Sequence, residues 1–269
     1  MTVRLRRAAR ILTRLVLVLP AVAVFAIAVV GPWLVGTDPD RIVAAPYSPM
    51  GDGLWFGADF TGRDVWARVL AGGRALLFVP VLAVLITTVL GTALGMLAGY
   101  LGGLTDAVVS RFDGAALALP PILVMLVLLH GWGYSSAVLV MVVVVTGVSF
   151  VSRIARAATV QVMRQGYVEQ AVGLGESVPS VLVREILPNI VRPILADAGT
   201  RLAVAVALTS AAGFLGFGAD EANWGAMISE NIEGITLTPW AVVLPAVCLG
   251  TLAVGANLGM DRLAARWDR

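Results

Sequence analysis

The sequence predicts an all-α membrane protein that crosses the bilayer six times. Of its 269 residues, 59% are hydrophobic and 13% are charged, and the mean hydropathy is +0.91, which no ordinary soluble domain matches. The charges are clustered, so that long stretches carry none. A helix needs about 20 apolar residues to cross a hydrocarbon core of roughly 30 Å, and the uncharged stretches reach that length.

The gaps between charges give the predicted spans. The longest gap encloses 39 residues between Asp113 and Arg153, and it holds two spans separated by a Gly- and Ser-containing turn near residues 130–136. The six spans are expected at about 11–35, 74–100, 108–130, 136–156, 193–214 and 240–261, in one domain over residues 1–269. The connecting segments are then 36–73, 157–192 and 215–239.

A secretory signal is the alternative for the first span, because Arg4–Arg14 precedes an apolar run. The run from Leu15 to Val35 is too long for a signal core, and no clear small-residue cleavage site ends it. These two features favour a membrane span.

Arginine counts orient the chain. Five arginines precede the first span, and five more lie between Ser152 and Arg192, so both regions are expected inside. The 215–239 loop is then outside; it carries four acidic residues and no basic one. With six spans, both termini lie in the cytoplasm.

Local motifs refine individual spans. Gly91, Gly95 and Gly99 recur every fourth residue in the second span, a spacing that lets a neighbouring helix approach closely; the general abundance of glycine in membrane helices is the alternative reading. Pro120 and Pro121 predict a kink in the third span.

The fifth span carries two charges, Asp197 and Arg201, spaced so that they share one helical face and can pair. Intramembrane charges are candidates for function. These two lie near the inner end of the span, where a structural ion pair or snorkelling to the interface also explains them. Since no charge lies near the centre of the other spans, an ion-coupled secondary carrier is disfavoured.

The composition also limits the chemistry. The chain has no lysine, so it lacks the P-loop lysine and is not a Walker-type ATPase by itself. The single Cys248 and single His130 exclude a disulfide framework and a Cys/His metal cluster. We therefore expect no catalytic residue, metal or cofactor in this chain, and no nucleic-acid partner.

A compact, charged insert interrupts the apolar sequence within residues 157–192. A first helix is expected over Gln161–Leu174 and ends at Gly175. Ser177 is the expected N-cap of a second helix, which ends at about Leu187. Pro179 fits the first turn of that helix, Pro188 ends it, and Val178, Val181, Leu182 and Ile186 form its apolar stripe.

The insert has two readings, a helix that rests on lipid and a docking element for protein. Its acidic residues Glu169, Glu176 and Glu185 would be repelled by an anionic inner leaflet. The charge therefore favours a protein partner over a lipid surface.

Residues 166–189, GYVEQAVGLGESVPSVLVREILPN, resemble the EAA loop of permease subunits of binding-protein-dependent ABC importers. The family pattern has Glu-Ala-Ala, a Gly four residues later and a Leu-Pro about a dozen residues further on. The sequence Glu169-Gln170-Ala171, then Gly175 and Leu187-Pro188, fills those places, with Gln170 in place of the central alanine.

Further motifs in the same order resemble the dipeptide/oligopeptide/nickel branch, and within it the "C" permease of each pair. They are FGADFTGRDVWAR at 56–68, LAGYLGGLTD at 97–106, GFLGFGADEANWGAMISE at 213–230 and the last span at 238–261. The likeness covers roughly residues 53–268. The third motif lacks the usual prolines and is about two residues shorter, which affects the expected outer docking surface and not the transporter class.

The resemblance implies a type I ABC importer permease fold in the inner membrane of a bacterium. It implies import of di- and oligopeptides, with nickel or another metal chelate as the alternative cargo; a secondary carrier and a non-transporting scaffold are the alternatives of other classes. The implied partners are a homologous second permease, two ATP-binding subunits or one fused ATPase that hold ATP and Mg, an external solute-binding protein and the lipid bilayer.

The resemblance also implies site residues. The coupling interface to the ATPase would consist of Tyr167, Glu169, Gln170, Ala171, Gly175, Leu187 and Pro188. Candidates in the outside segments are Asp59, Gly62, Arg63, Asp64, Trp224 and Gly225.

Overall fold

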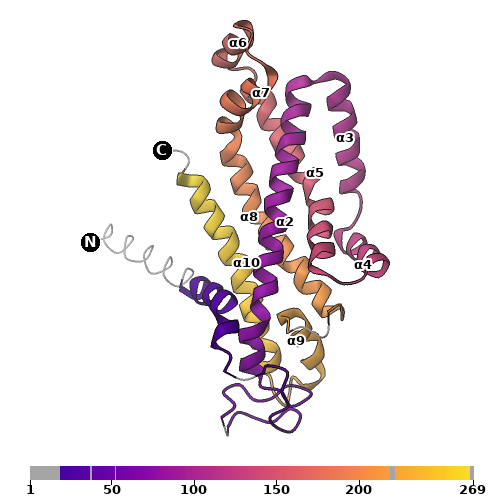
Figure 1. Cartoon of the computed structure of the whole chain (residues 1–269), viewed down its shortest axis with the longest axis vertical. Coiled ribbons are helices and arrows are strands. Elements are labelled where there is room, and N and C mark those ends of the chain that lie inside the picture. The colour runs from indigo at the N-terminus through magenta and orange to yellow at the C-terminus, as the bar shows by residue number, and fades with distance from the viewer. Residues whose placement is uncertain (1–18, 37, 52, 219–221, 267–269) are drawn as a thin grey trace, which may run out of the picture. The chain divides into compact units, whose positions relative to one another are not determined.

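The computed structural model of the chain describes residues 19–36, 38–51, 53–218 and 222–266, and these are mostly helical (Figure 1). The described residues form no β-strand, and the segment before α2 contains only isolated β-bridges. The arginine-rich start and the first residues of the predicted first span lie outside the described residues.

In chain order, the described helices are Leu19–Leu34, α2 (Val65–Leu101), α3 (Gly103–Leu117), α4 (Pro121–Trp132), α5 (Ser136–Val162), α6 (Gly166–Gly173), α7 (Val178–Ser180), the π-helix η1 (Val181–Ile186), α8 (Leu187–Phe214), α9 (Trp224–Asn231), the 3-10 helix η2 (Ile232–Gly234) and α10 (Trp240–Arg266).

Four of the described helices are long and apolar enough to cross a membrane. They are α2, α5, the continuous run Val178–Phe214 and α10. Helices α3 and α4 reach that standard only as a pair, which would make a fifth span, and Leu19–Leu34 is apolar but shorter. A mostly helical fold with several apolar helices of membrane-spanning length is therefore confirmed for the described residues, and the count of six spans stays a prediction.

The second span begins nine residues earlier than predicted, at Val65. Asp64 precedes the helix, and its carboxylate accepts a hydrogen bond from the backbone N–H of Trp66 at 2.9 Å, as an N-cap residue does. The prediction began the span at Arg74, but this residue lies within α2.

The third span is two helices, and the single kinked helix of the prediction is wrong. Helix α3 ends at Leu117 and α4 begins at Pro121, and the two are bent by 83°. Pro120 is extended, because the residue before a proline avoids helical geometry. Pro121 then takes the first position of α4, where a missing N–H costs nothing.

The predicted end of the second insert helix at Leu187 is also wrong. The helix continues from Val178 through η1 into α8 and ends at Phe214. Pro188 lies in the first turn of α8, directly after the π-helical segment, and a proline is tolerated in a first turn. The first insert helix starts at Gly166 and not at Gln161, because α5 extends to Val162.

The chain divides into two compact units. Unit 1 comprises residues 1–79 and 206–256, and unit 2 comprises residues 80–205 and 257–269. The core of unit 1 contains Val24, Ala28, Val65, Val69, Leu76, Val206, Trp224, Met227, Ala241, Cys248 and Leu252. The core of unit 2 contains Met96, Ala155, Val168, Ala171, Val181, Leu182, Ile186, Ile190 and Ile194.

The glycine face of α2 is a close contact with α5 inside unit 2. A Cβ added at Gly91 would lie 2.6 Å from the Cβ of Val151, and at Gly95 it would lie 2.7 Å from that of Ala155. The predicted close approach is thus confirmed, and it is made within the chain.

Candidate functional site

The insert, defined as residues 163–186, is held to unit 2 by one apolar face of α6. Val168 and Ala171 point inward and are buried in the core with residues of η1 and α8. The small side chain of Ala171 allows α6 to approach η1 closely. Ala171 thus faces its own chain, and a partner would not touch its side chain directly.

Helix α6 ends in the geometry that its sequence predicts. Leu174 is the C-cap, and Gly175 has a φ of +80°, which L side chains adopt at a cost. The N–H of Gly175 donates to the carbonyl of Val172 at 3.0 Å, and the N–H of Glu176 donates to that of Ala171 at 3.2 Å. These two bonds form a Schellman motif.

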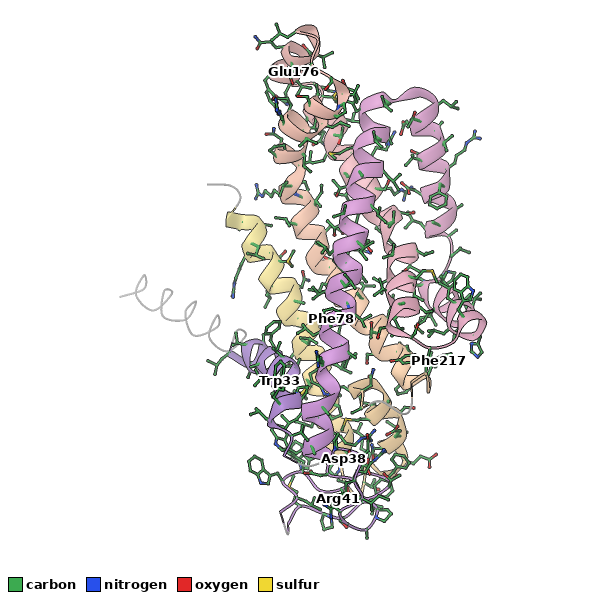
Figure 2. The ribbon with its side chains drawn as sticks, in the orientation of Figure 1. Trp33, Asp38, Arg41, Phe78, Glu176 and Phe217 are labelled. Atoms are coloured by element: carbon green, nitrogen blue, oxygen red, sulfur yellow. The ribbon has the colours of Figure 1, made fainter. Side chains whose placement is uncertain are left out.

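The turn after Gly175 uses Ser177 differently from the prediction. Ser177 is the N-cap residue of α7, but its side chain makes no capping hydrogen bond. The hydroxyl of Ser180 instead donates to a carboxylate oxygen of Glu176 at 2.8 Å. Figure 2 shows Glu176 in this turn, at the free end of the insert.

The other face of the insert exposes apolar side chains. Leu174 is 77% exposed, and Tyr167 and Val172 are also exposed. Glu169 and Gln170 are also exposed on α6. Of the predicted interface residues at the end of the insert, Leu187 is half-buried against the core and Pro188 is exposed.

Two of the candidates predicted for the outside segments, Asp59 and Arg63, belong to a largely buried charged network in unit 1. The network consists of Asp59, Arg63, Arg68 and Glu230. Arg68 is fully buried, and its Nη1 donates to Asp59 Oδ2 at 2.9 Å and to Glu230 Oε2 at 2.8 Å. Arg63 Nε donates to the same Asp59 oxygen at 2.8 Å. The motif at 56–68 is therefore joined to the motif at 213–230.

Hydrogen bonds extend the network to the backbone. Asp59 Oδ1 accepts from the N–H groups of Thr61 and Arg63 and from the Thr61 hydroxyl, each at 2.9 Å. Asn231 Oδ1 accepts the N–H of Phe60 at 2.9 Å, and its amide donates to the carbonyl of Met227. Arg68, Glu230 and Asn231 were absent from the predicted site residues, although Arg68 and Glu230 lie within the quoted motifs.

Burial and hydrogen bonding act in opposite directions on the two aspartates of this segment. Burial of Asp59 raises its pKa, but the hydrogen bonds from Arg63 and Thr61 and the charge of Arg63 outweigh this, and the pKa is lowered overall. For Asp64, burial dominates over two backbone hydrogen bonds, and its pKa is raised.

The remaining outer candidates are structural in this unit. A Cβ at Gly62 would collide with the carbonyl of Ala44, and one at Gly225 would collide with that of Ser210. Trp224 is fully buried, and its indole N–H donates to the carbonyl of Val69 at 2.8 Å. Trp224 and Gly225 fasten α9 to the start of α2 and the end of α8, whereas Gly62 fits closely against the segment before α2.

The predicted intramembrane ion pair is present on α8. Arg201 Nε lies 3.4 Å from Asp197 Oδ1, and the guanidinium lies 4.4 Å from the centre of the Phe150 ring on α5. A cation–π contact of this kind favours a packed, structural role for Arg201.

A second charge cluster, between α3 and α5, escaped the sequence prediction. Arg156 of α5 forms an ion pair with Asp106 of α3, and the carboxylate of Asp113, further along α3, is buried. The predicted spans excluded Asp106 and placed Asp113 at an end, so neither residue stood out.

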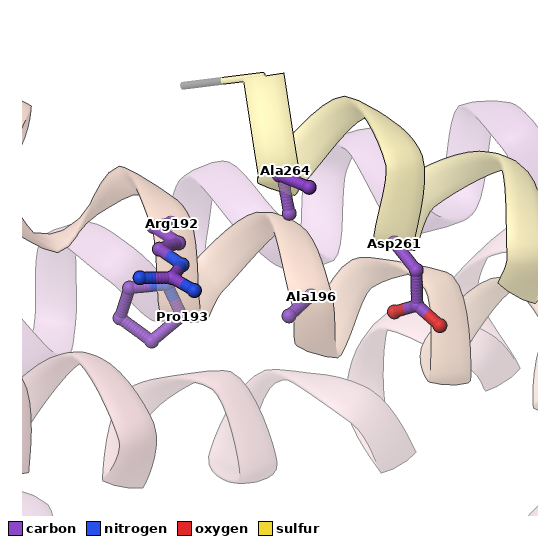
Figure 3. Close-up of a pocket in the computed structure, with 6 residues that line it drawn as sticks. Arg192, Pro193, Ala196, Asp261 and Ala264 are labelled. Carbon is purple, nitrogen blue, oxygen red and sulfur yellow. The ribbon is translucent and has the colours of Figure 1, made fainter. Parts of the chain in front are cut away.

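A small cavity of about 310 Å³ lies between the start of α8 and the end of α10 in unit 2 (Figure 3). Its lining contains Arg192, Pro193 and Ala196 on α8, with Asp261, Ala264 and Ala265 on α10. Alanine and proline side chains make up most of this lining, and we assign the cavity to the packing of the two helices.

Comparison with known proteins identifies the family. The family model described as the binding-protein-dependent transport system inner membrane component matches residues 91–269. The chain belongs to this family. Its membrane-spanning helices and inner-membrane assignment follow from that membership, and the family is one of transporter permease subunits.

Individual members of the family align over most of the chain. The probable D,D-dipeptide transport system permease protein DdpC of Escherichia coli is 30% identical over 233 residues, which are 86% of this chain and 78% of DdpC. The dipeptide transport system permease protein DppC of Alkalihalophilus pseudofirmus is 29% identical over 249 residues, 92% of this chain and 81% of DppC.

The fold also matches a solved permease. A chain of the inward-facing MetNI methionine ABC transporter superposes with a TM-score of 0.56 at 16% identity, covering 72% of this chain and 94% of that chain. At this identity the likeness concerns the fold alone.

Proposed function

We propose that this chain is one permease subunit of an ATP-driven importer of di- and oligopeptides. It would span the inner membrane six times, with both termini and the insert in the cytoplasm. Relatives named for D,D-dipeptide, dipeptide, oligopeptide and glutathione transport support the peptide class. Nickel or a metal chelate is the alternative cargo, and the uptake experiment described below distinguishes it from peptides.

The observation that carries the coupling role is the two-sided construction of α6. One side is buried through Val168 and Ala171, and the other exposes Tyr167, Val172 and Leu174. Exposed apolar side chains that cluster on an otherwise polar segment are typical of a protein interface. The ATPase is the partner that fits a family of permease subunits.

The mechanism follows from the attachment of α6. When the ATPases bind ATP and close, they would move the insert as one body. Helix α6 is packed against η1 and α8, and α5 precedes it by only three residues. The motion would therefore pass into α5 and α8, while ATP and Mg remain on the partner chains and hydrolysis resets the inward-facing state.

The full assembly would contain a homologous second permease and either two ATP-binding subunits or one fused ATPase. A solute-binding protein would deliver the substrate outside, where the segment of residues 36–64 and the loop before α10 are proposed to lie. The charged network ties these two segments together, so it would present them as one rigid surface.

Uptake in a deletion strain tests the cargo. We expect that the gene restores uptake of a radiolabelled dipeptide and that unlabelled oligopeptides compete. Restoration of Ni²⁺ uptake without dipeptide uptake would overturn the peptide assignment and leave the importer class intact. Uptake that follows an ion gradient without ATP would instead indicate a secondary carrier.

A substitution at Gly175 tests the coupling role. Gly175→Asp places a charged side chain at a φ of +80° in the turn of the insert, and we expect normal membrane insertion with loss of at least nine-tenths of uptake. Gly103→Asp is the matched control, because Gly103 is also exposed at a positive φ, +52°, with open space around it. Wild-type uptake in the Gly175 variant would contradict the proposal.

A further inference from the structure

The strongest unassigned feature of the molecule is a row of three charges between α3 and α5. Arg156 donates to Asp106 through two groups: Nη2 contacts Oδ2 at 2.6 Å, and Nε contacts Oδ1. Ser110 on α3 also donates to Asp106, at 3.2 Å. Arg156 is thus fully engaged at one end of the row.

Asp113 stands at the other end of the row without a partner. Its side chain is 1% exposed, and neither carboxylate oxygen has a hydrogen-bond partner among the described residues. Its charge nevertheless acts electrostatically on Arg156. A buried carboxylate without a hydrogen bond is strongly unfavourable in general, so Asp113 requires an explanation.

The spacing makes the two carboxylates alternative partners for one arginine. Asp106 and Asp113 are seven residues apart, which is two turns on one face of α3 and about 10 Å along its axis. Helix α5 runs antiparallel to α3 (Figure 1). The path along α5 from Arg156 toward the level of Asp113 passes Ser152 and Ser149, at i−4 and i−7, and both hydroxyls are buried and unpaired.

We propose that Arg156 exchanges between Asp106 and Asp113 during the transport cycle. The proposal rests on the proposed function, because α5 leads through three residues into α6 and receives the motion of the insert. A shift by one helical turn, about 5.4 Å, is an established size for such transitions, and an arginine side chain spans the rest. Asp106 holds the resting state, and Asp113 is the positioning residue for the ATP-bound state.

State-dependent stability tests the exchange. The complex is isolated through a tag on this chain, and its thermal midpoint is measured without nucleotide and with a non-hydrolysable ATP analogue. We expect Asp106→Asn to lower the midpoint by about 2–4 °C in the resting state only. Asp113→Asn should leave the resting midpoint unchanged or higher, and lower it by a similar amount with the analogue.

Controls separate this role from a purely structural one. Arg111→Gln changes an exposed charge on the same helix, and it should shift neither midpoint. In an Arg156→Gln background, the opposite state dependence of the two asparagine variants should disappear. Equal shifts in both nucleotide states for Asp113→Asn would overturn the exchange, and so would persistence of the pattern in the Arg156→Gln background.

The outcomes also separate the exchange from the proposed coupling. If the thermal midpoint of the wild-type complex does not change with the ATP analogue, the coupling role of the insert is contradicted. A wild-type complex that responds to the analogue while both asparagine variants respond alike would contradict the exchange alone.

Discussion

The charged network of unit 1 and the insert of unit 2 are built in opposite ways. The network turns four charged side chains inward and pairs them, with Arg68 and Asp59 fully buried. The insert turns apolar side chains outward, with Leu174 largely exposed. The network pairs its charges within its own unit, whereas the insert exposes apolar surface that we propose a partner covers. Substitutions should therefore cost stability in the first region and transport in the second.

The largest effect is expected where a network charge loses its partners. Arg68→Ala removes a donor from the buried Asp59 and the half-buried Glu230, and breaking a buried pair costs about 3–5 kcal/mol. We expect a sharp loss of folded protein in the membrane and a much lower thermal midpoint in detergent. Arg41→Ala, which removes an exposed arginine of the segment before α2, should stay within about 0.5 kcal/mol; equal behaviour of the two variants would refute the network's role.

The insert has a stability component of its own on its buried side. Ile186 is fully buried in the core that holds α6, and Ile186→Ala should cost about 2–5 kcal/mol through lost contacts and the cavity left behind. Limited proteolysis should then cut residues 163–186 faster than in the wild type. Unchanged cleavage would show that α6 is held by other contacts.

Acid should weaken the network through Asp59. The folded state lowers the pKa of this carboxyl, so its stabilisation is present above the unfolded value of about 3.9. It is lost as the pH falls through the lower folded value. The stability difference between the wild type and Asp59→Asn should thus be greatest at neutral pH and shrink below about pH 4, as unfolding midpoints across pH would measure. A difference that grows in acid would contradict the assignment.

The smallest stability effect is expected at the exposed side of the insert. Leu174→Ser should change the unfolding free energy by less than about 0.5 kcal/mol, yet reduce dipeptide uptake at least tenfold. Leu237→Ser, another largely exposed leucine, should affect neither quantity as strongly. Normal transport by the Leu174 variant would restrict the proposed interface to Tyr167 and Val172.

The sequence predicts best what depends on local geometry. Gly175 ends α6 because only a residue tolerant of positive φ suits that position, and the glycine face of α2 follows from a four-residue spacing. Asp197 and Arg201 pair because they are four residues apart on one helix. In each case the deciding partner lies within a turn or two of the chain.

What the sequence misses depends on partners far apart in the chain. Glu230 and Arg68 are 162 residues apart, and Arg156 and Asp106 are 50 apart. The positions of charged residues also gave a wrong start for the second span, since Arg68 and Arg74 lie within α2. Arg68 is neutralised there by the network. The effect of prolines was predicted wrongly in two ways. Pro120–Pro121 breaks a span that was predicted only to bend, and Pro188 does not end the helix that it was predicted to end.

The π-helical segment η1 fixes the direction in which the insert points. Six residues, Val181–Ile186, wind more widely than an α-helix would, so this stretch holds about one residue more than α-helical geometry requires. Deleting a single residue there would restore a regular helix and rotate everything before it by about 100° around the axis of α8. Tyr167 and Leu174 would then face a different direction with every contact residue still present. The orientation of the contact surface is therefore specified by the number of residues in η1 as well as by their identity.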